Sequence, residues 1–290
     1  IVFTTHTPVM AGNEEHSHDL LQFMGAYNGL NYDQAVQIGG DPFNMTVAAL
    51  RLSYIANGVS QLHGMTARSM WRGNMGTSPI IAITNGVHQK TWQHPQIWQI
   101  FQTQGNVWRP HMTAKRQLIK YIEDKTGIRL EQDNLIIGFA RRFAAYKRSG
   151  LIFHNPEIIE PLLKERVVQL VFAGKAHPLD EVGKQVIQKL MHYVKRFPES
   201  VIFLENYNMA IGRLMTSGCD VWLNNPQRPL EASGTSGMKA ALNGVLNIST
   251  LDGWWPEGCE HGENGWQISG GYEGPEQTRV DAVNLYDVLL

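Results

Sequence analysis

Apolar runs of strand length recur through the second half of the chain. They predict five strands, at 135–139, 167–173, 201–204, 221–223 and 245–249. Between these runs the apolar residues follow helical spacing, as at Val182, Val186, Leu190 and Val194. Further helices are expected over 211–216 and 239–243. Strands that are apolar throughout and alternate with helices are typical of a parallel sheet covered on both faces, so the pattern predicts an α/β fold.

The first part of the chain has a less regular pattern. Ile1–Ala11 predicts a buried strand followed by a loop. A helix is expected from 44 to 61, with His63 on or just beyond its end. The apolar face of this helix comprises Met45, Ala48, Ala49, Leu52, Ile55, Ala56 and Val59. Ile80–Ile83 predicts a compact buried strand that delivers Asn85 at its carboxyl end, where α/β folds place ligands.

The stretch from 95 to 112 is rich in Gln, Trp and Pro and is predicted to be a loop that separates two halves. A domain boundary is therefore expected shortly after Asn85. The chain begins in a strand without Met and ends in an amphipathic helix at Asp281–Leu290. We expect it to be a fragment of a longer protein.

Composition narrows the class of protein. With 43% hydrophobic and 18% charged residues, the 290-residue chain is typical of a globular protein, and a net charge of −1 gives no indication of nucleic-acid binding. No apolar run is long enough to cross a membrane. Cys219 and Cys259 are too few for a disulfide framework, so a reducing, cytoplasmic location is expected. Residues 14–19 contain two His and three acids but lack the i, i+4 histidine pair of a zinc site, so they predict a solvated loop and no metal.

One candidate site surrounds Lys239. The small, polar residues of 231–237 lead into a predicted helix start, where free backbone N–H groups and the helix dipole favour an anion. Lys239 is expected in the first turn of that helix and the strand after it is expected to be buried. A lysine held near phosphate in a dry site is well placed for imine chemistry, because burial lowers its pKa. The alternative is a lysine that is only an exposed cation.

A second candidate site follows the strand at 135–139. The segment 140–148 contains four cations, Arg141, Arg142, Lys147 and Arg148. Cations gathered at the carboxyl end of a strand are costly without anions. Arginine suits a bidentate grip on phosphate and lysine supplies a point charge. The alternative is a solvated, basic helix start.

The residues Glu231-Ala-Ser-Gly-Thr-Ser-Gly-Met-Lys239, followed by 242–244 and by Asp252-Gly253, closely resemble a motif of the α-glucan (glycogen and starch) phosphorylases, in the form of the bacterial and archaeal branch. The resemblance implies that Lys239 binds pyridoxal 5′-phosphate as a Schiff base. It also implies that Gly234, Thr235 and Tyr207 line the cofactor and that Arg141 lies near its phosphate. Arg142 and Lys147 are implied to hold the substrate phosphate, although many family members have Glu where Ala145 stands.

The resemblance further implies a set of sugar-binding residues, namely His6, His63, Asn85, Glu231, Ser233 and Gly234. The implied fold is a pair of Rossmann-like lobes of the GT-B type with the first lobe incomplete. On this basis residues 1–88 are assigned to the remnant of the N-terminal lobe and 89–290 to the C-terminal lobe. The implied partners are an α-1,4-glucan and inorganic phosphate, with no nucleic acid and no membrane, and a homo-oligomer remains open.

The implied activity is retaining phosphorolysis of an α-1,4-glucan to α-D-glucose 1-phosphate, with the cofactor phosphate acting against the substrate phosphate. Two alternatives are kept. One is a nucleotide-sugar-dependent glycosyltransferase resembling glycogen synthase, in which a second Glu often stands at the position of Lys239. The other is a catalytically silent glucan-binding fragment, because the glycine-rich phosphate loop of the family belongs to a part outside this sequence.

Overall fold

The computed structural model describes residues 1–290 and divides into two compact units. The first unit comprises residues 1–85, 229–233 and 252–257, and the second comprises 86–228, 234–251 and 258–290. Two short segments from the second half of the chain therefore belong to the first unit, which the sequence pattern did not predict. The assignment of the two parts of the chain to Rossmann-like lobes stays a prediction.

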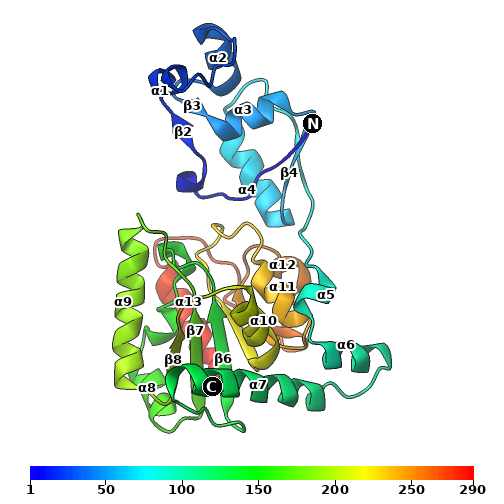
Figure 1. Cartoon of the computed structure of the whole chain (residues 1–290), viewed down its shortest axis with the longest axis vertical. Coiled ribbons are helices and arrows are strands. Elements are labelled where there is room, and N and C mark those ends of the chain that lie inside the picture. Colours follow the sequence, from blue (N-terminus) through cyan, green and yellow to red (C-terminus); the bar gives the residue numbers. More distant parts are fainter. The chain divides into compact units, whose positions relative to one another are not determined.

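The second unit is built on a six-stranded, wholly parallel sheet (Figure 1). Its strands are β6 (Leu135–Ala140), β7 (Val168–Ala173), β8 (Val201–Leu204), β9 (Val221–Asn224), β10 (Leu246–Thr250) and β11 (Gly265–Ile268). The order β11-β10-β9-β6-β7-β8 runs outward in both directions from the β6–β9 pair, as in doubly wound dinucleotide-binding folds. The five predicted strands and the α/β class are confirmed, and β11 is an additional strand.

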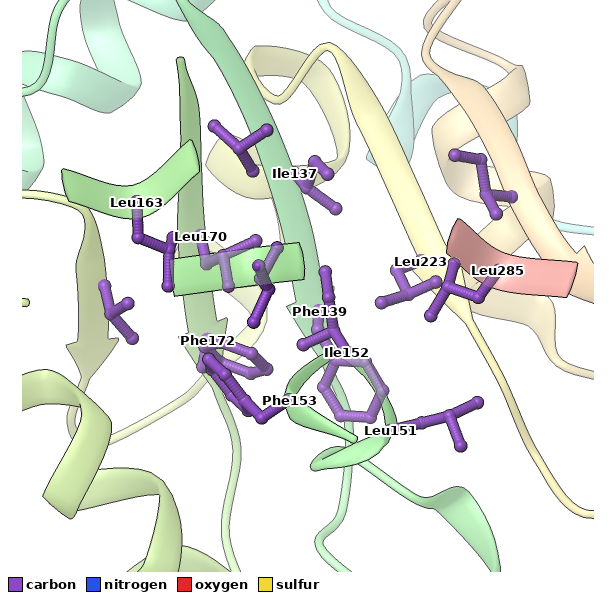
Figure 2. Close-up of a cluster of buried hydrophobic side chains, with 14 of the residues drawn as sticks. Ile137, Phe139, Leu151, Ile152, Phe153, Leu163, Leu170, Phe172, Leu223 and Leu285 are labelled. Carbon is purple, nitrogen blue, oxygen red and sulfur yellow. The ribbon is translucent and has the colours of Figure 1, made fainter. Parts of the chain in front are cut away.

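Helices cover both faces of this sheet. One apolar cluster contains residues of α7 (Trp108–Thr126), α10 (Met209–Gly218) and α11 (Thr235–Ala241). The opposite cluster, part of which Figure 2 shows, contains residues of α8 (Pro156–Lys164), α9 (Glu181–Arg196) and α13 (Gln277–Leu289). Phe139 and Phe172 of adjacent strands are almost completely buried in the second of these clusters, with ring centroids 5.7 Å apart. The expected burial of the sheet on both faces is confirmed.

The predicted loop from 95 to 112 is wrong. The chain forms α5 (Gln89–Trp92), α6 (Pro95–Gln102) and, after a short turn, the first residues of α7. Pro95 occupies the first turn of α6, where its missing N–H costs no hydrogen bond, and Ile97 is buried beneath the helix. Proline and glutamine in this stretch therefore begin and continue helices.

The first unit contains a three-stranded parallel sheet in the order β1-β4-β5. Its strands are β1 (Val2–Thr4), β4 (Ile55–Gly58) and β5 (Ile80–Ala82), and a short antiparallel pair is formed by β2 (Glu15–His16) and β3 (Phe43–Asn44). The helices are α1 (His18–Phe23), α2 (Tyr32–Gly39), α3 (Met45–Leu52) and α4 (Gln61–Trp71). The remaining short elements of the chain are η1 (Met10–Gly12), η2 (Ala145–Lys147), η3 (Leu151–Phe153) and α12 (Trp255–Gly258).

The single helix predicted from 44 to 61 is wrong in its second half. The helix α3 ends at Leu52, and Ile55–Gly58 is the central strand of the small sheet. Small residues allow this packing: a Cβ atom on Gly58 would lie only 2.8 Å from the backbone nitrogen of Gly64. His63 consequently lies in the first turn of α4 and not at the end of a long helix.

Two other expectations for the first unit need correction. The strands at its edges are not fully buried, since Val2 is 67% exposed and Ile81 is 42% exposed. Residues 14–19 are not a solvated loop throughout, because His18 is buried at the start of α1. Its ring nitrogens lie 2.8 Å from the hydroxyl of Tyr27 and 2.8 Å from the carbonyl oxygen of Gly40.

Candidate functional site

The loops after β6 and β9 meet at the point where the strand order reverses. The backbone N–H of Gln227 donates to the carbonyl of Tyr146 at 2.7 Å, and Nε of Arg148 donates to the carbonyl of Asn225 at 2.9 Å. The basic loop, residues 141–148, is thereby joined to the segment that follows β9. Ligands of open parallel sheets bind outside the carboxyl ends of the strands at such a switch point.

The cations of the basic loop have different roles. Arg148 is buried and pairs with the carboxylate of Asp281 on α13, at 2.6 Å. The hydroxyl of Ser269 donates to the other oxygen of the same carboxylate at 2.6 Å. Arg148, for which no anion role was predicted, is therefore neutralised inside the second unit. The other three cations are the ones to which the sequence assigned a phosphate.

Those three cations differ in exposure. Arg141 and Lys147 are each 8% exposed, whereas Arg142 is exposed. The guanidinium of Arg141 lies 5.9 Å from the ring centroid of Phe139, and Nζ of Lys147 lies 4.7 Å from the ring centroid of Tyr146. The loop contains only the single turn η2, so it is not the start of a helix.

Lys239 lies further along its helix than predicted. The helix α11 begins at Thr235, and Gly234 precedes it in a left-handed conformation with φ of 77°. The hydroxyl of Ser236 accepts from the indole nitrogen of Trp222 and donates to Asn224, which fixes the start of α11 against β9. The glycine- and serine-rich stretch is thus itself helical, and Lys239 occupies the last turn of α11 instead of the first.

The amine of Lys239 lies against an aromatic ring. Its Nζ is 3.7 Å from the ring centroid of Trp92, a half-buried residue at the end of α5. Lys239 is itself half-buried and forms no ion pair with an acid, and burial lowers its pKa, as predicted. An amine in this state is easier to deprotonate, and hence more nucleophilic at neutral pH, than that of an exposed lysine.

Tyr207 and Arg141 belong to the same neighbourhood. A Cβ atom placed on Gly212 would lie 2.9 Å from the hydroxyl of Tyr207 and 3.5 Å from the ring of Trp92. Burial raises the pKa of Tyr207, and the charge of Arg141 opposes this rise. The structure therefore brings the predicted residues Lys239 and Tyr207 close to Trp92, and Arg141 acts on Tyr207 through its charge. Sequence reasoning missed Trp92, because it placed this tryptophan beside a predicted loop.

His63 occupies the first unit and is 1% exposed. Its backbone N–H donates to the hydroxyl of Ser60, which donates in turn to the carbonyl of Ala232 at 2.7 Å. The backbone N–H of Val59 lies 3.1 Å from Nδ1 of the imidazole, so Nδ1 is the acceptor and Nε2 carries the proton. Nε2 has no partner in the protein. Burial first, and then the nearby His6, lower the pKa of His63 to about 4, so the ring is neutral at neutral pH.

The segment 229–233 is held in place by the residues that follow β10. The carboxylate of Asp252 accepts from the backbone N–H groups of Glu231 and Gly253, each at 2.8 Å. Gly253 has φ of 58°, and a Cβ atom there would lie 2.3 Å from the carbonyl oxygen of Ser233. The side-chain oxygen of Ser233 is buried and has no partner. The Asp-Gly pair of the motif therefore shapes the backbone that presents Glu231 and Ser233.

The predicted site residues fall into two sets, one in each unit. The first unit contains His6, His63, Asn85, Glu231 and Ser233, and the second contains Arg141, Arg142, Lys147, Tyr207, Gly234, Thr235 and Lys239. In the first unit, the backbone N–H of Asn85 donates to the carbonyl of Val59 at 3.1 Å.

No three or more His, Cys, Asp and Glu side chains are arranged to hold a metal ion. None of the helices combines the length and apolar character needed to cross a bilayer.

The sheet order and the polar loops at its switch point define a doubly wound α/β protein of the Rossmann-like class. Residues 99–263, more than half of the chain, match the family described as carbohydrate phosphorylase. The chain belongs to this family.

Known relatives match between half and almost all of the chain. Maltodextrin phosphorylase of Thermococcus litoralis is 41% identical over 99% of the chain and 41% of its own length. Glycogen phosphorylase of Aquifex aeolicus is 35% identical over 99% of the chain and 50% of its own length. The cytosolic α-glucan phosphorylase 2 of Arabidopsis thaliana is 32% identical over 50% of the chain and 20% of its own length. The chain thus spans half or less of each of these relatives.

Proposed function

We propose that the protein to which this chain belongs cleaves an α-1,4-glucan with inorganic phosphate, giving α-D-glucose 1-phosphate with retained configuration, and that it uses pyridoxal 5′-phosphate. The observation that carries this proposal is the environment of Lys239. Its amine is half-buried, has a pKa lowered by burial, forms no ion pair and lies against the ring of Trp92. Membership of the carbohydrate phosphorylase family and the names of the matched relatives support the choice of reaction.

The residues around Lys239 fit such a cofactor. An aldehyde needs a deprotonated amine, which the burial of Lys239 favours. A heteroaromatic ring needs apolar surface and a polar neighbour, which Trp92 and Tyr207 provide. When bound, the cofactor would supply a phosphate group beside the substrate phosphate. We assign its attachment to Lys239 and its surroundings to Gly234, Thr235, Tyr207 and Arg141.

The basic loop would bind the phosphates. Arg142 is exposed and can move toward a ligand, whereas the positions of Arg141 and Lys147 are fixed by burial. Two phosphate groups that lie close together repel each other, and cations placed beforehand reduce this repulsion without reorganisation during the reaction. In this proposal Arg142 and Lys147 hold the substrate phosphate and Arg141 lies at the cofactor phosphate.

The first unit would bind the sugar. The hydroxyl groups of a sugar are neutral hydrogen-bond donors and acceptors. A buried polar group of the protein that lacks a hydrogen bond destabilises the protein, and a sugar hydroxyl can supply that bond. His63 offers an Nε2–H donor and Ser233 offers a hydroxyl, and both atoms are buried without a protein partner. The proposal assigns the glucosyl unit to these two residues together with His6, Asn85 and Glu231 of the first unit and Gly234 of the second.

The test is borohydride trapping at Lys239 in the full-length protein. Supplied with pyridoxal 5′-phosphate, the protein should absorb at wavelengths beyond those of Trp and Tyr. Reduction should leave a peptide whose added mass maps to Lys239. Lys239→Ala should abolish trapping and nearly all glucan phosphorolysis, whereas Lys189→Ala, on the surface of α9, should change neither. If the intact protein shows neither the absorbance nor the modified peptide, the proposal fails, and assays with nucleotide-sugar donors and for glucan binding alone would distinguish the alternatives.

A further inference from the structure

A single buried amide joins the helix of Lys239 to the segment that carries Trp92. Asn243 is 1% exposed and follows α11. Its Nδ2 donates to the carbonyl of Trp92 at 2.9 Å and to the carbonyl of Lys239 at 2.8 Å. Its Oδ1 accepts from the backbone N–H of His94 at 2.7 Å. One side chain therefore fixes three backbone groups, two on the tryptophan segment and one at the lysine.

A second contact reinforces this connection. Nε2 of Gln93 donates to the carbonyl of Leu242 at 2.8 Å. The helix α5 has only four residues and no side-chain cap at its start, so it has little internal hydrogen bonding of its own. The position of Trp92 over the amine of Lys239 thus depends on contacts with the end of α11, above all on Asn243.

We propose that Asn243 is a positioning residue, which holds Trp92 over the amine of Lys239 and so keeps that amine partly shielded from water and ready to react with an aldehyde. The identification of the aldehyde as pyridoxal 5′-phosphate rests on the proposed function, but the arrangement of Asn243, Trp92 and Lys239 does not.

Two effects of the Trp92 ring oppose each other. The face of an indole attracts an ammonium group, which favours the protonated lysine. Removing water from the amine favours the neutral form. The pKa of Lys239 is lowered, and burial is the cause. The titratable or charged groups near this cluster include Tyr207, near Trp92 at Gly212, and Arg141, which acts on Tyr207. They also include His94 and Arg213, which line a cavity together with Trp92.

The experiment compares Asn243→Ala with a matched control, Asn247→Ala. Asn247 is another buried amide bonded to α11, since its Nδ2 donates to the carbonyl of Gly237, but it does not contact residues 92–94. In the cofactor-free, full-length protein, competitive labelling of lysines across a pH series, read by mass spectrometry, gives the pKa of Lys239 directly. The rate of reaction with pyridoxal 5′-phosphate is then followed by absorbance over the same pH series.

In Asn243→Ala the pKa of Lys239 should rise, so the rate of reaction at neutral pH should fall, by roughly tenfold, with the share of free amine. The rates should converge at high pH, where every lysine is deprotonated. Asn247→Ala should leave both quantities unchanged even if it lowers the thermal stability equally. Trp92→Leu, which removes the ring and keeps Asn243, should raise the pKa in the same direction and serves as the second variant if Asn243→Ala does not fold.

The proposal is overturned if Asn243→Ala and Asn247→Ala give the same pKa and the same pH profile, or if Trp92→Leu leaves the pKa of Lys239 unchanged. Failure of the proposed function looks different. In that case the wild-type protein forms no trapped product at Lys239, while the labelling pKa still rises in Asn243→Ala and Trp92→Leu. The second result would keep Asn243 as a positioning residue for an amine that serves another reaction.

Discussion

The two units differ in the charge of the polar groups that they offer to a ligand. In the first unit the two buried groups without a protein partner are neutral: His63 has a pKa of about 4, and Ser233 presents a hydroxyl. In the second unit the polar groups include the cations Arg141, Arg142 and Lys147, beside the amine of Lys239, whose pKa is lowered by burial. The first set suits the hydroxyl groups of a sugar and the second suits phosphates. In the proposed function, the first unit therefore takes the sugar and the second unit takes the phosphates.

The second unit also divides its own charges. Arg148 stands one residue from Lys147, yet it pairs with Asp281 inside the protein, while Arg142 is exposed. Charge in this unit therefore serves the fold in one case and the candidate site in the other. The three predictions below test these divisions.

The largest effect is expected from Asp281→Ala. It leaves the guanidinium of Arg148 buried without its counter-charge, and removing one partner of a buried pair typically costs about 3–5 kcal/mol. Guanidinium-induced unfolding should show this loss in the second unit. The control is Glu276→Ala, which breaks the exposed pair with Arg279 and should change stability by less than about 0.5 kcal/mol. Equal losses of stability in the two variants would mean that the pair between Arg148 and Asp281 does not stabilise the second unit.

The strands of the second unit were easier to predict from the sequence than those of the first. The strands of the second unit are buried on both faces, so their apolar runs are visible in the sequence. In the first unit, Ile55–Gly58 contains Ala, Asn and Gly, and its burial depends on the close approach of Gly64. A strand of such small residues carries no alternation or apolar run, so the pattern was extended wrongly from α3.

The next effect concerns phosphate. In the full-length enzyme, Arg142→Ala should raise the barrier to phosphorolysis by about 2–4 kcal/mol, the usual cost of losing one electrostatic stabiliser. The loss should appear in the dependence of the rate on phosphate concentration, with cofactor content and stability near those of the wild type because Arg142 is exposed. Arg279→Ala is the matched exposed control. Unchanged phosphate dependence in Arg142→Ala would show the basic loop to be only a solvated surface.

The candidate site was predicted in part. Arg142 directly follows another arginine, and Lys239 follows a glycine-rich stretch. Their chemistry can therefore be predicted from neighbouring residues in the sequence. The partners that position them are remote in sequence: Asp281 lies 133 residues from Arg148, and Asn243 lies 151 residues from Trp92. Nothing in the residues themselves indicates these contacts, because a buried Asn or Asp acquires its role only from what the fold places beside it.

The smallest effect is the response of the first unit to acid. His63 has a pKa lowered from 6.5 to about 4. Between pH 6.5 and about 4, His63 is therefore protonated in the unfolded chain but neutral in the folded chain. This contribution to stability is complete above the unfolded pKa and is lost as pH falls toward 4. At pH 5 the first unit should be destabilised by about 1–2 kcal/mol relative to neutral pH. His63→Gln should remove this part of the dependence, whereas His16→Gln should retain it. Unfolding measured by denaturant at both pH values gives the difference for each protein. If the wild type and His63→Gln lose the same stability in acid, His63 accepts a proton in the folded state. His63 is then not the neutral donor on which the comparison between the two units depends.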